Sequence, residues 1–227
     1  MNSVNVLRTG VLLALIAGVT ACGRFDGRHL VVESFEVADS IERVELRGAV
    51  AHVELTVGTG PVSVRQTTRY RTSPPHVGHE VTGRTLTVTD SGCPKRVGTA
   101  GCEITFAMRV PAATAISIRT EVGNVHAHDL AGDLTVDTAV GDVDASGLSG
   151  HRVEARTGTG TVRLRFATPP DSVDARVSAG EVEIRVPTHV RYAIDCDGYA
   201  EINVGRDGSS SHRITASSPL GISIGAS

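Results

Sequence analysis

Two histidines and one aspartate are spaced so that they could bind a metal ion together. His126 and His128 are two residues apart in a run where apolar and polar residues alternate, so both side chains point to the polar side. Asp144 follows Gly141 by the same three positions by which His126 follows Gly123. In a stacked chain the three would lie on neighbouring layers, and His and Asp are ligands of divalent metals. An ordinary wet surface is the simpler explanation, so we assign no metal site and no cofactor and keep the three residues as a speculative set.

A serine motif lies near the end of the sequence. Gly221-Ile-Ser-Ile-Gly matches the G-x-S-x-G pattern of serine hydrolases. That pattern requires a strand-to-helix turn and a histidine further along the chain, and neither follows here. We treat the match as chance, assign no catalytic residue and predict that the chain is not an enzyme.

The elements that would position these residues belong to a repeat of about 20 residues. Motifs built around a glycine recur with spacings of 18, 19, 20 and 20 residues. They are Glu121-Val-Gly-Asn-Val, Ala139-Val-Gly-Asp-Val, Gly158-Thr-Gly-Thr-Val, Ser178-Ala-Gly-Glu-Val and Gly198-Tyr-Ala-Glu-Ile, the last with Ala200 in the place of the glycine. A constant period of this length indicates a stack of repeats that bury their apolar faces against one another.

Each repeat contains two short runs in which apolar residues occupy every second position, which is a strand signal. The glycine lies where the chain reverses, because a left-handed backbone angle is cheap only for glycine. We therefore predict an all-β chain, a β-solenoid or parallel β-helix-like stack of two-strand rungs. An antiparallel β-sandwich is the alternative, since it also has strands every 8–12 residues, but the glycine turn recurs only after every second strand. The predicted inward residues are Val143, Ala145, Val153, Ala155, Val162, Leu164, Phe166, Val173, Ala175, Val177, Val182, Ile184, Val186, Ile194 and Cys196.

Residues 1–21 have the composition of an export signal, with Arg8 ahead of an apolar run too short for a stable membrane helix. The run ends in Val19-Thr-Ala-Cys, which resembles the lipobox of bacterial lipoproteins. The resemblance implies cleavage after Ala21 and lipidation of Cys22, with acyl chains such as palmitate as the membrane anchor. We therefore predict an extracytoplasmic bacterial protein that is lipid-anchored to the cell membrane. An ordinary signal peptide or an uncleaved anchor is the alternative.

Export also bears on the remaining cysteines. Cys93 and Cys102 bound a loop rich in glycine, proline and charge, so we predict a disulfide between them, with two free thiols as the alternative. Cys196 is the odd one and is predicted to be a buried free thiol. We expect three segments, namely the signal peptide 1–21, a polar spacer 22–35 and one all-β repeat domain 36–227.

Composition excludes some classes of partner. The formal net charge is −3, whereas nucleic-acid-binding domains usually present a basic face. The chain has four Phe, three Tyr and no Trp, too few for platforms that stack on bases or sugar rings. We predict no nucleic-acid partner, and no small-molecule substrate is evident.

The order of these features resembles the bacterial putative-adhesin (DUF4097) family. The residues that carry the resemblance are Met108-Arg-Val-Pro, then Ile116-Ser-Ile-Arg-Thr-Glu-Val-Gly-Asn-Val, then the glycine repeats, and the match covers roughly Phe35 to the end. The family implies an extracytoplasmic β-solenoid-like domain and brings no catalytic residues. The alanine at position 200 departs from its pattern, so the geometry of the last rung is an open point.

Three functions follow as hypotheses. The first is a non-catalytic, lipid-anchored cell-envelope protein whose adhesin-like domain binds an envelope protein or a cell-wall polymer. The second is a regulatory accessory protein in envelope stress signalling. The third, which we favour least, is an enzyme acting on envelope polysaccharide, with Asp142, Asp144, Asp174 and Glu183 as the available acids.

Overall fold

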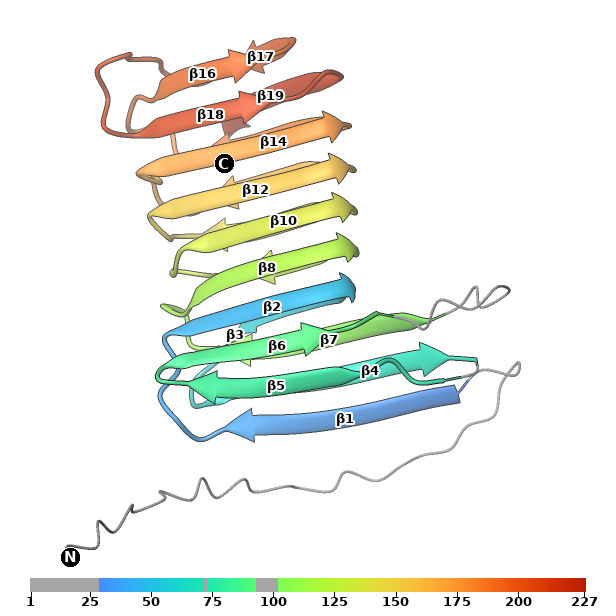
Figure 1. Ribbon diagram of the computed structural model, residues 1–227. Helices are drawn as coiled ribbons and strands as arrows, with labels where there is room; N and C mark the ends of the chain where they lie inside the picture. The colour runs from blue at the N-terminus through green and yellow to red at the C-terminus, as the bar shows by residue number, and fades with distance from the viewer. Residues whose placement is uncertain (1–28, 72, 93–101) are drawn as a thin grey trace, which may run out of the picture.

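The computed structural model describes residues 29–71, 73–92 and 102–227 (Figure 1). Within these ranges the protein is all-β, and no helix is present that could cross a membrane. In chain order the strands are β1 (His29–Val37), β2 (Arg43–Val50), β3 (His52–Val57), β4 (Val62–Tyr70), β5 (Val77–Thr82), β6 (Thr85–Asp90), β7 (Glu103–Val110), β8 (Ala115–Val122), β9 (Val125–His128), β10 (Leu134–Val140), β11 (Val143–Leu148), β12 (Arg152–Thr159), β13 (Val162–Phe166), β14 (Ser172–Ala179), β15 (Glu181–Val186), β16 (Ala193–Asp197), β17 (Ala200–Ile202), β18 (Arg213–Ser217) and β19 (Gly221–Ala226).

The strands form two facing sheets, and a pair of strands joined at a corner, one in each sheet, makes one rung of a stack (Figure 1). The nine-strand sheet has the order β16-β18-β14-β12-β10-β8-β2-β6-β5. The ten-strand sheet has the order β1-β4-β7-β3-β9-β11-β13-β15-β19-β17. Through the middle of the stack all neighbours are parallel and in register, as where Leu134 pairs with both Ile116 and Val153. The predicted solenoid of two-strand rungs is confirmed, and the antiparallel sandwich is wrong.

The rungs do not follow chain order at the two ends of the stack. The β2–β3 rung lies between β6–β7 and β8–β9, and the β18–β19 rung lies between β14–β15 and β16–β17. The last rung in the stack is therefore β16–β17, although β18 and β19 follow it in the sequence. This interleaving depends on pairing between distant segments, which a local repeat does not reveal.

The first end of the stack is closed by antiparallel strands. β4 pairs antiparallel with β7, β1 pairs antiparallel with β4, and β5 folds back antiparallel on β6. Across the two sheets the rings of Phe35 on β1 and His79 on β5 stack with their centres 3.9 Å apart. β1 begins at His29, so residues 29–35 of the predicted polar spacer 22–35 lie in a strand.

The core is a narrow column of aliphatic side chains between the sheets, with Phe106, Phe166 and Tyr192 as its largest members. Every inward residue predicted from Val143 to Val186 is buried. Ile194 and Cys196 are only half-buried, because they lie in the last rung and no further rung covers them. One continuous cluster of buried residues runs through the stack from Val37 to Ile224.

Two features require glycine at the corners: a positive φ, which the sequence predicted, and close contact with the preceding rung, which it did not. Gly123, Gly141, Gly160 and Gly180 have φ values of 156°, 151°, 145° and 149°. In addition, a Cβ atom on any of the last three would overlap the carbonyl oxygen of the corner glycine in the preceding rung. Stacking at this corner therefore has no room for a side chain.

The prediction that Ala200 replaces the corner glycine of the last repeat is wrong. Ala200 pairs with Ile222, which pairs with Val182, so Ala200 does not occupy the place of a corner glycine. The corner residue is Gly198, with a φ of 129°, and a Cβ atom there would overlap the carbonyl oxygen of Ser218. The last rung therefore turns its corner in fewer residues, with four positions from Cys196 to Ala200 against seven between the equivalent residues Ala175 and Val182.

Candidate functional site

Several charged side chains on the outer face of the nine-strand sheet form ion pairs within a strand or with the next rung. Arg156 contacts Glu154 on its own strand and Asp174 on the next strand at 3.0 Å. Arg176 in turn contacts Asp174 at 2.8 Å. These groups are partly exposed, so each pair contributes at most about 1 kcal/mol to stability. The row gives this face a pattern in which carboxylates and guanidinium groups offset each other.

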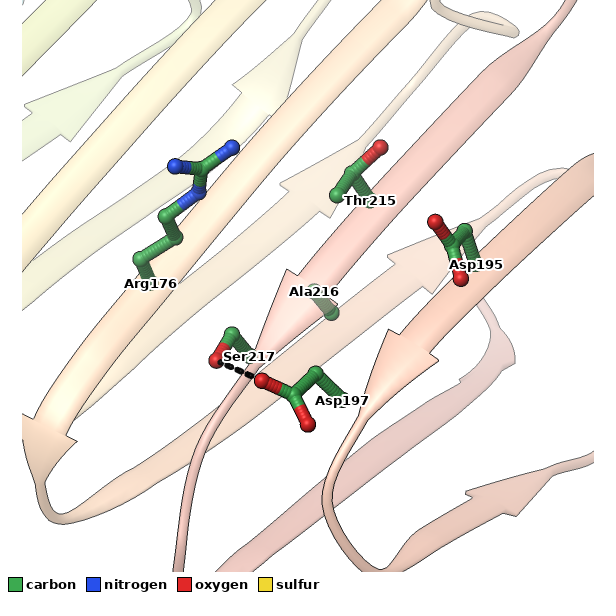
Figure 2. Close-up of a pocket in the computed structure, with 6 residues that line it drawn as sticks. All are labelled: Arg176, Asp195, Asp197, Thr215, Ala216 and Ser217. Atoms are coloured by element: carbon green, nitrogen blue, oxygen red, sulfur yellow. Dashed lines mark hydrogen bonds between the residues drawn. The ribbon is translucent and has the colours of Figure 1, made fainter.

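The row of ion pairs ends at a hollow near the β16 edge of the sheet (Figure 2). The register of β14, β18 and β16 places Thr215 between Asp174 and Asp195, and Ser217 between Arg176 and Asp197. Because the β18 side chains are short, they leave a hollow of about 220 Å³. It is lined by Arg176, Asp195, Asp197, Thr215, Ala216 and Ser217.

Asp195 and Asp197 lack the ion pairs that Glu154 and Asp174 make on this face. Among the residues that the structure describes, no Arg, Lys or His lies within ion-pair distance of either one. Within the described part of the chain, the side-chain hydrogen bond that reaches this pair comes from the Ser217 hydroxyl to Asp197, at 3.4 Å. Two exposed, neighbouring carboxylates without a cation can form charge-assisted hydrogen bonds with a basic group of a partner.

The speculative metal set is brought together only in part. Asp144 lies in register beside His126, and Ser146 beside His128, as the repeat spacing predicts. However, Asp144 pairs with Arg165 at 3.3 Å, and Nδ1 of His128 lies 2.7 Å from the Ser146 hydroxyl. No group of three His, Cys, Asp or Glu within the described ranges is placed to hold a metal ion. We do not propose a metal site here.

The four acids considered for an enzyme are dispersed, and each already has a partner. Asp142 lies at a corner, where its side chain accepts a hydrogen bond from the backbone of Thr161 at 2.8 Å. Asp174 lies on the nine-strand sheet, whereas Asp144 and Glu183 lie on the ten-strand sheet. Glu183 pairs with Arg185 at 3.0 Å. The acids therefore do not converge on one place.

The serine of the G-x-S-x-G match lies inside a strand. Ser223 is in the middle of β19, in register with Glu183 on one side and Glu201 on the other. The nucleophile pattern needs the serine at a turn from strand to helix, and β19 has no such turn at this position. The geometry does not support a nucleophile here.

The cysteines are described only in part. Cys22 and Cys93 lie outside the described residues, so lipidation of Cys22 and the Cys93–Cys102 disulfide remain predictions. Cys102 packs against the core directly before β7. The Cys196 thiol is free and half-buried. Burial raises its pKa, against the attraction of Arg206, and the negative charge of Asp195 raises it further.

Sequence reasoning missed the two features that define the exposed end of the stack. The alternation Ile194-Asp-Cys-Asp predicts the inward residues Ile194 and Cys196, but it did not identify the outward Asp195 and Asp197 as a candidate site. Their lack of a cation depends on Thr215 and Ser217, which become their neighbours only through the interleaved rungs. An alignment of successive repeats cannot show that Thr215 and Ser217 lie beside the two aspartates.

No family model matches the chain, and no curated protein matches it in sequence. Solved structures that are similar in outline include a protein from Clostridium sporogenes described as a "putative cell adhesion protein". It is 15% identical, with a TM-score of 0.47, and the match covers 87% of this chain and 100% of that chain. Another is a "putative adhesin" from Bacteroides fragilis, 17% identical, with a TM-score of 0.44 over 86% of this chain and 96% of that chain. The fold described above rests on strand pairing and not on these similarities.

Proposed function

We propose that this protein is a non-catalytic, lipid-anchored component of a bacterial cell envelope whose solenoid binds another envelope molecule. The proposal includes membership of the putative-adhesin family and a mature chain that begins at Cys22. The observation that carries it is the outer surface, where charged residues are paired in rows along the stack and do not converge on a cleft. Such a surface suits contact with a large partner better than turnover of a small one.

The anchor would also orient the solenoid. Cys22 and His29 are seven residues apart, a reach of at most about 25 Å. The capped end around β1 would therefore lie near the membrane (Figure 1). With strands about 4.8 Å apart, the β16–β17 end of the ten-strand sheet would stand about 40 Å further out. The exposed end that holds the hollow is then the end presented to the surroundings.

Two experiments test this proposal. Labelling of growing cells with palmitate is expected to mark the wild-type chain and not Cys22→Ala, and equal labelling of both would contradict the anchor. Cross-linking of intact cells that express the chain, followed by purification, is expected to recover a distinct envelope partner. If the chain is recovered only by itself, under conditions that trap a known envelope complex, the binding role is contradicted.

A further inference from the structure

The two ends of the stack are finished differently. At the first end, antiparallel strands and the Phe35–His79 stack close the solenoid. At the other end, β16 and β17 are the outermost strands of their sheets and pair on one side only. An edge strand of this kind is a template for another strand unless it is protected.

The free backbone groups of β16 can be identified from its bonds to the neighbouring strand. The N–H of Ala193 donates to His212, and the carbonyl of Asp197 accepts from Ser218, so the odd-numbered residues face β18. In a strand the intervening residues face the opposite way, so the N–H and C=O groups of Ile194 and Cys196 point away from the sheet. At the start of the strand, the same outward groups of Tyr192 are already bonded to the 205–207 segment. The open edge is therefore short and begins after Tyr192.

The side chains at this edge alternate in a way that specifies a partner. Ile194 and Cys196 point into the core and are only half-buried, so one face of the open edge is apolar. Asp195 and Asp197 point outward, are exposed and have no cation within ion-pair distance among the described residues. Arg206 is near enough to Cys196 to influence its thiol but pairs with neither carboxylate.

We propose that the β16 edge binds an extended segment of a partner protein that adds to the nine-strand sheet as its next strand. Main-chain hydrogen bonds to Ile194 and Cys196 provide the attachment, as in other cases of strand addition. The segment alternates apolar residues, which cover Ile194 and Cys196, with Arg or Lys, which lie beside Asp195 and Asp197. The inference rests on the proposed binding role and is independent of the lipid anchor.

The protein itself contains the pairing that the proposal requires. On β13, Arg163 and Arg165 alternate with buried apolar residues, and this strand lies between two acidic strands. Arg165 contacts Asp144 on one side at 3.3 Å, and Arg163 contacts Glu183 on the other at 3.8 Å. An arginine-alternating strand beside an aspartate-bearing strand is therefore a stable arrangement in this fold.

A second copy of the chain does not fit the same edge. Head-to-tail stacking would place β5 of one copy against β16 of another, and the outward charge of β5 is Glu80. Pairing of β16 with itself would bring Asp195 and Asp197 of the two copies together. Like charges on directly opposite residues destabilise a strand pair. Charge thus selects a basic foreign segment over self-assembly.

Binding of a peptide with the β13 sequence tests the proposal. The probe is Thr161-Val-Arg-Leu-Arg-Phe-Ala with a fluorescent label, titrated into the full chain in detergent and followed by polarisation. We expect saturable binding that weakens as salt is raised. Because opposite-charge cross-strand pairs are worth a few tenths to about 1 kcal/mol each, the double variant Asp195→Asn, Asp197→Asn is expected to bind about 3- to 20-fold more weakly.

Matched controls separate charge at the edge from charge on the face. Asp137→Asn removes an exposed carboxylate from β10, in the middle of the same face, and is expected to leave binding within twofold. A peptide with both arginines changed to glutamate is expected not to bind. Equal thermal melting of the variants and the wild type shows that the substitutions leave the fold intact.

Hydrogen exchange locates the peptide. In the free protein the amides of Ile194 and Cys196 are expected to exchange quickly, while that of Ala193 is protected by its bond to His212. A saturating amount of peptide is expected to slow exchange at Ile194 and Cys196. No binding up to about 1 mM peptide, or binding that leaves both amides unprotected, overturns the proposal. A partner that is still recovered by cross-linking in cells would then bind elsewhere, and the proposed function would stand.

Discussion

The hydroxyl of Thr157 donates a hydrogen bond of 2.8 Å to the carbonyl oxygen of Gly141, the corner glycine of the preceding rung. Thr138 makes the corresponding contact with Gly123 at 3.4 Å. Thr157 and Thr138 lie side by side in one buried column, which also contains Thr120. A row of threonines therefore satisfies backbone carbonyl groups at the glycine corners.

The corner glycines predict graded costs for substitution by alanine. Gly160→Ala combines a positive φ with overlap onto the Gly141 carbonyl and is expected to destabilise the protein by at least about 3 kcal/mol. Gly60 has a φ of 107° with open space around it, so Gly60→Ala should cost only about 1–2 kcal/mol. Urea unfolding followed by circular dichroism measures both values.

Gly208→Ala is the matched control for the two glycine variants. Gly208 is exposed, has open space around the added methyl group and has no unusual φ, so the expected change is within about 0.5 kcal/mol. Similar losses for Gly160→Ala and Gly60→Ala would show that the rung contact adds nothing to the backbone cost.

The threonine column predicts opposite effects on stability for removing a hydroxyl at one position and adding one at the next. Thr157→Val removes the hydroxyl that bonds the Gly141 carbonyl and should cost about 1–2 kcal/mol. In the next rung the column continues with Val177, so Val177→Thr supplies a hydroxyl beside Gly160 and should be neutral or stabilising by up to about 1 kcal/mol. Unfolding free energies of the two variants and of the double variant test this. Strong destabilisation by Val177→Thr would contradict the role assigned to the column.

The parts of the fold that depend on local pattern could be predicted from the sequence. Alternation with period two and the recurring glycine turn gave the two-strand rungs, the inward residues and the position of Asp144 beside His126. The reason is that each of these features is decided within a repeat or between successive repeats. The Ala200 alignment failed because the corner of the last rung is shorter, with four positions from Cys196 to Ala200 against seven between the equivalent residues Ala175 and Val182.

The arrangement at the two ends could not be predicted, because it depends on distant pairing. β2 lies beside β8 although about 70 residues separate Val44 from its partner Ile116, and β18 intervenes between β14 and β16. The candidate site follows from this second arrangement, since Thr215 and Ser217 are what leave Asp195 and Asp197 without arginine neighbours. No repeat pattern contains that information.

Thiol counting tests the predicted covalent state of all four cysteines. If Cys22 is lipidated and Cys93 is bonded to Cys102, the denatured, unreduced protein has one titratable thiol, that of Cys196. Three thiols under the same conditions would contradict the disulfide. In the native protein Cys196 should react slowly at pH 8 because burial raises its pKa and reduces the thiolate fraction. Cys196→Ala should abolish the remaining signal.

Asp90 predicts a change of stability with pH. The residue is 8% exposed, and its carboxylate accepts hydrogen bonds from the backbone N–H groups of Gly92 at 2.6 Å and Val50 at 3.1 Å. Burial raises its pKa from the ordinary value of 3.8, and this effect outweighs the bonds to Gly92, Val50 and Ala49, which lower it. The folded protein therefore binds a proton at Asp90 more tightly than the unfolded chain does.

The sign of the effect follows from this raised pKa. The stabilising contribution of Asp90 is fully present below the unfolded pKa near 4 and is lost as the pH rises through the folded pKa. Asp90→Asn keeps the side chain neutral throughout, so the difference in unfolding free energy between wild type and variant should change as the pH is raised above 4 and then level off. Urea unfolding at intervals from pH 4 to 7 measures it, with Asp137→Asn as the control for loss of an exposed carboxylate. A difference that is constant across this range, or one that shifts in favour of the wild type with rising pH, would show that the backbone hydrogen bonds outweigh burial at Asp90.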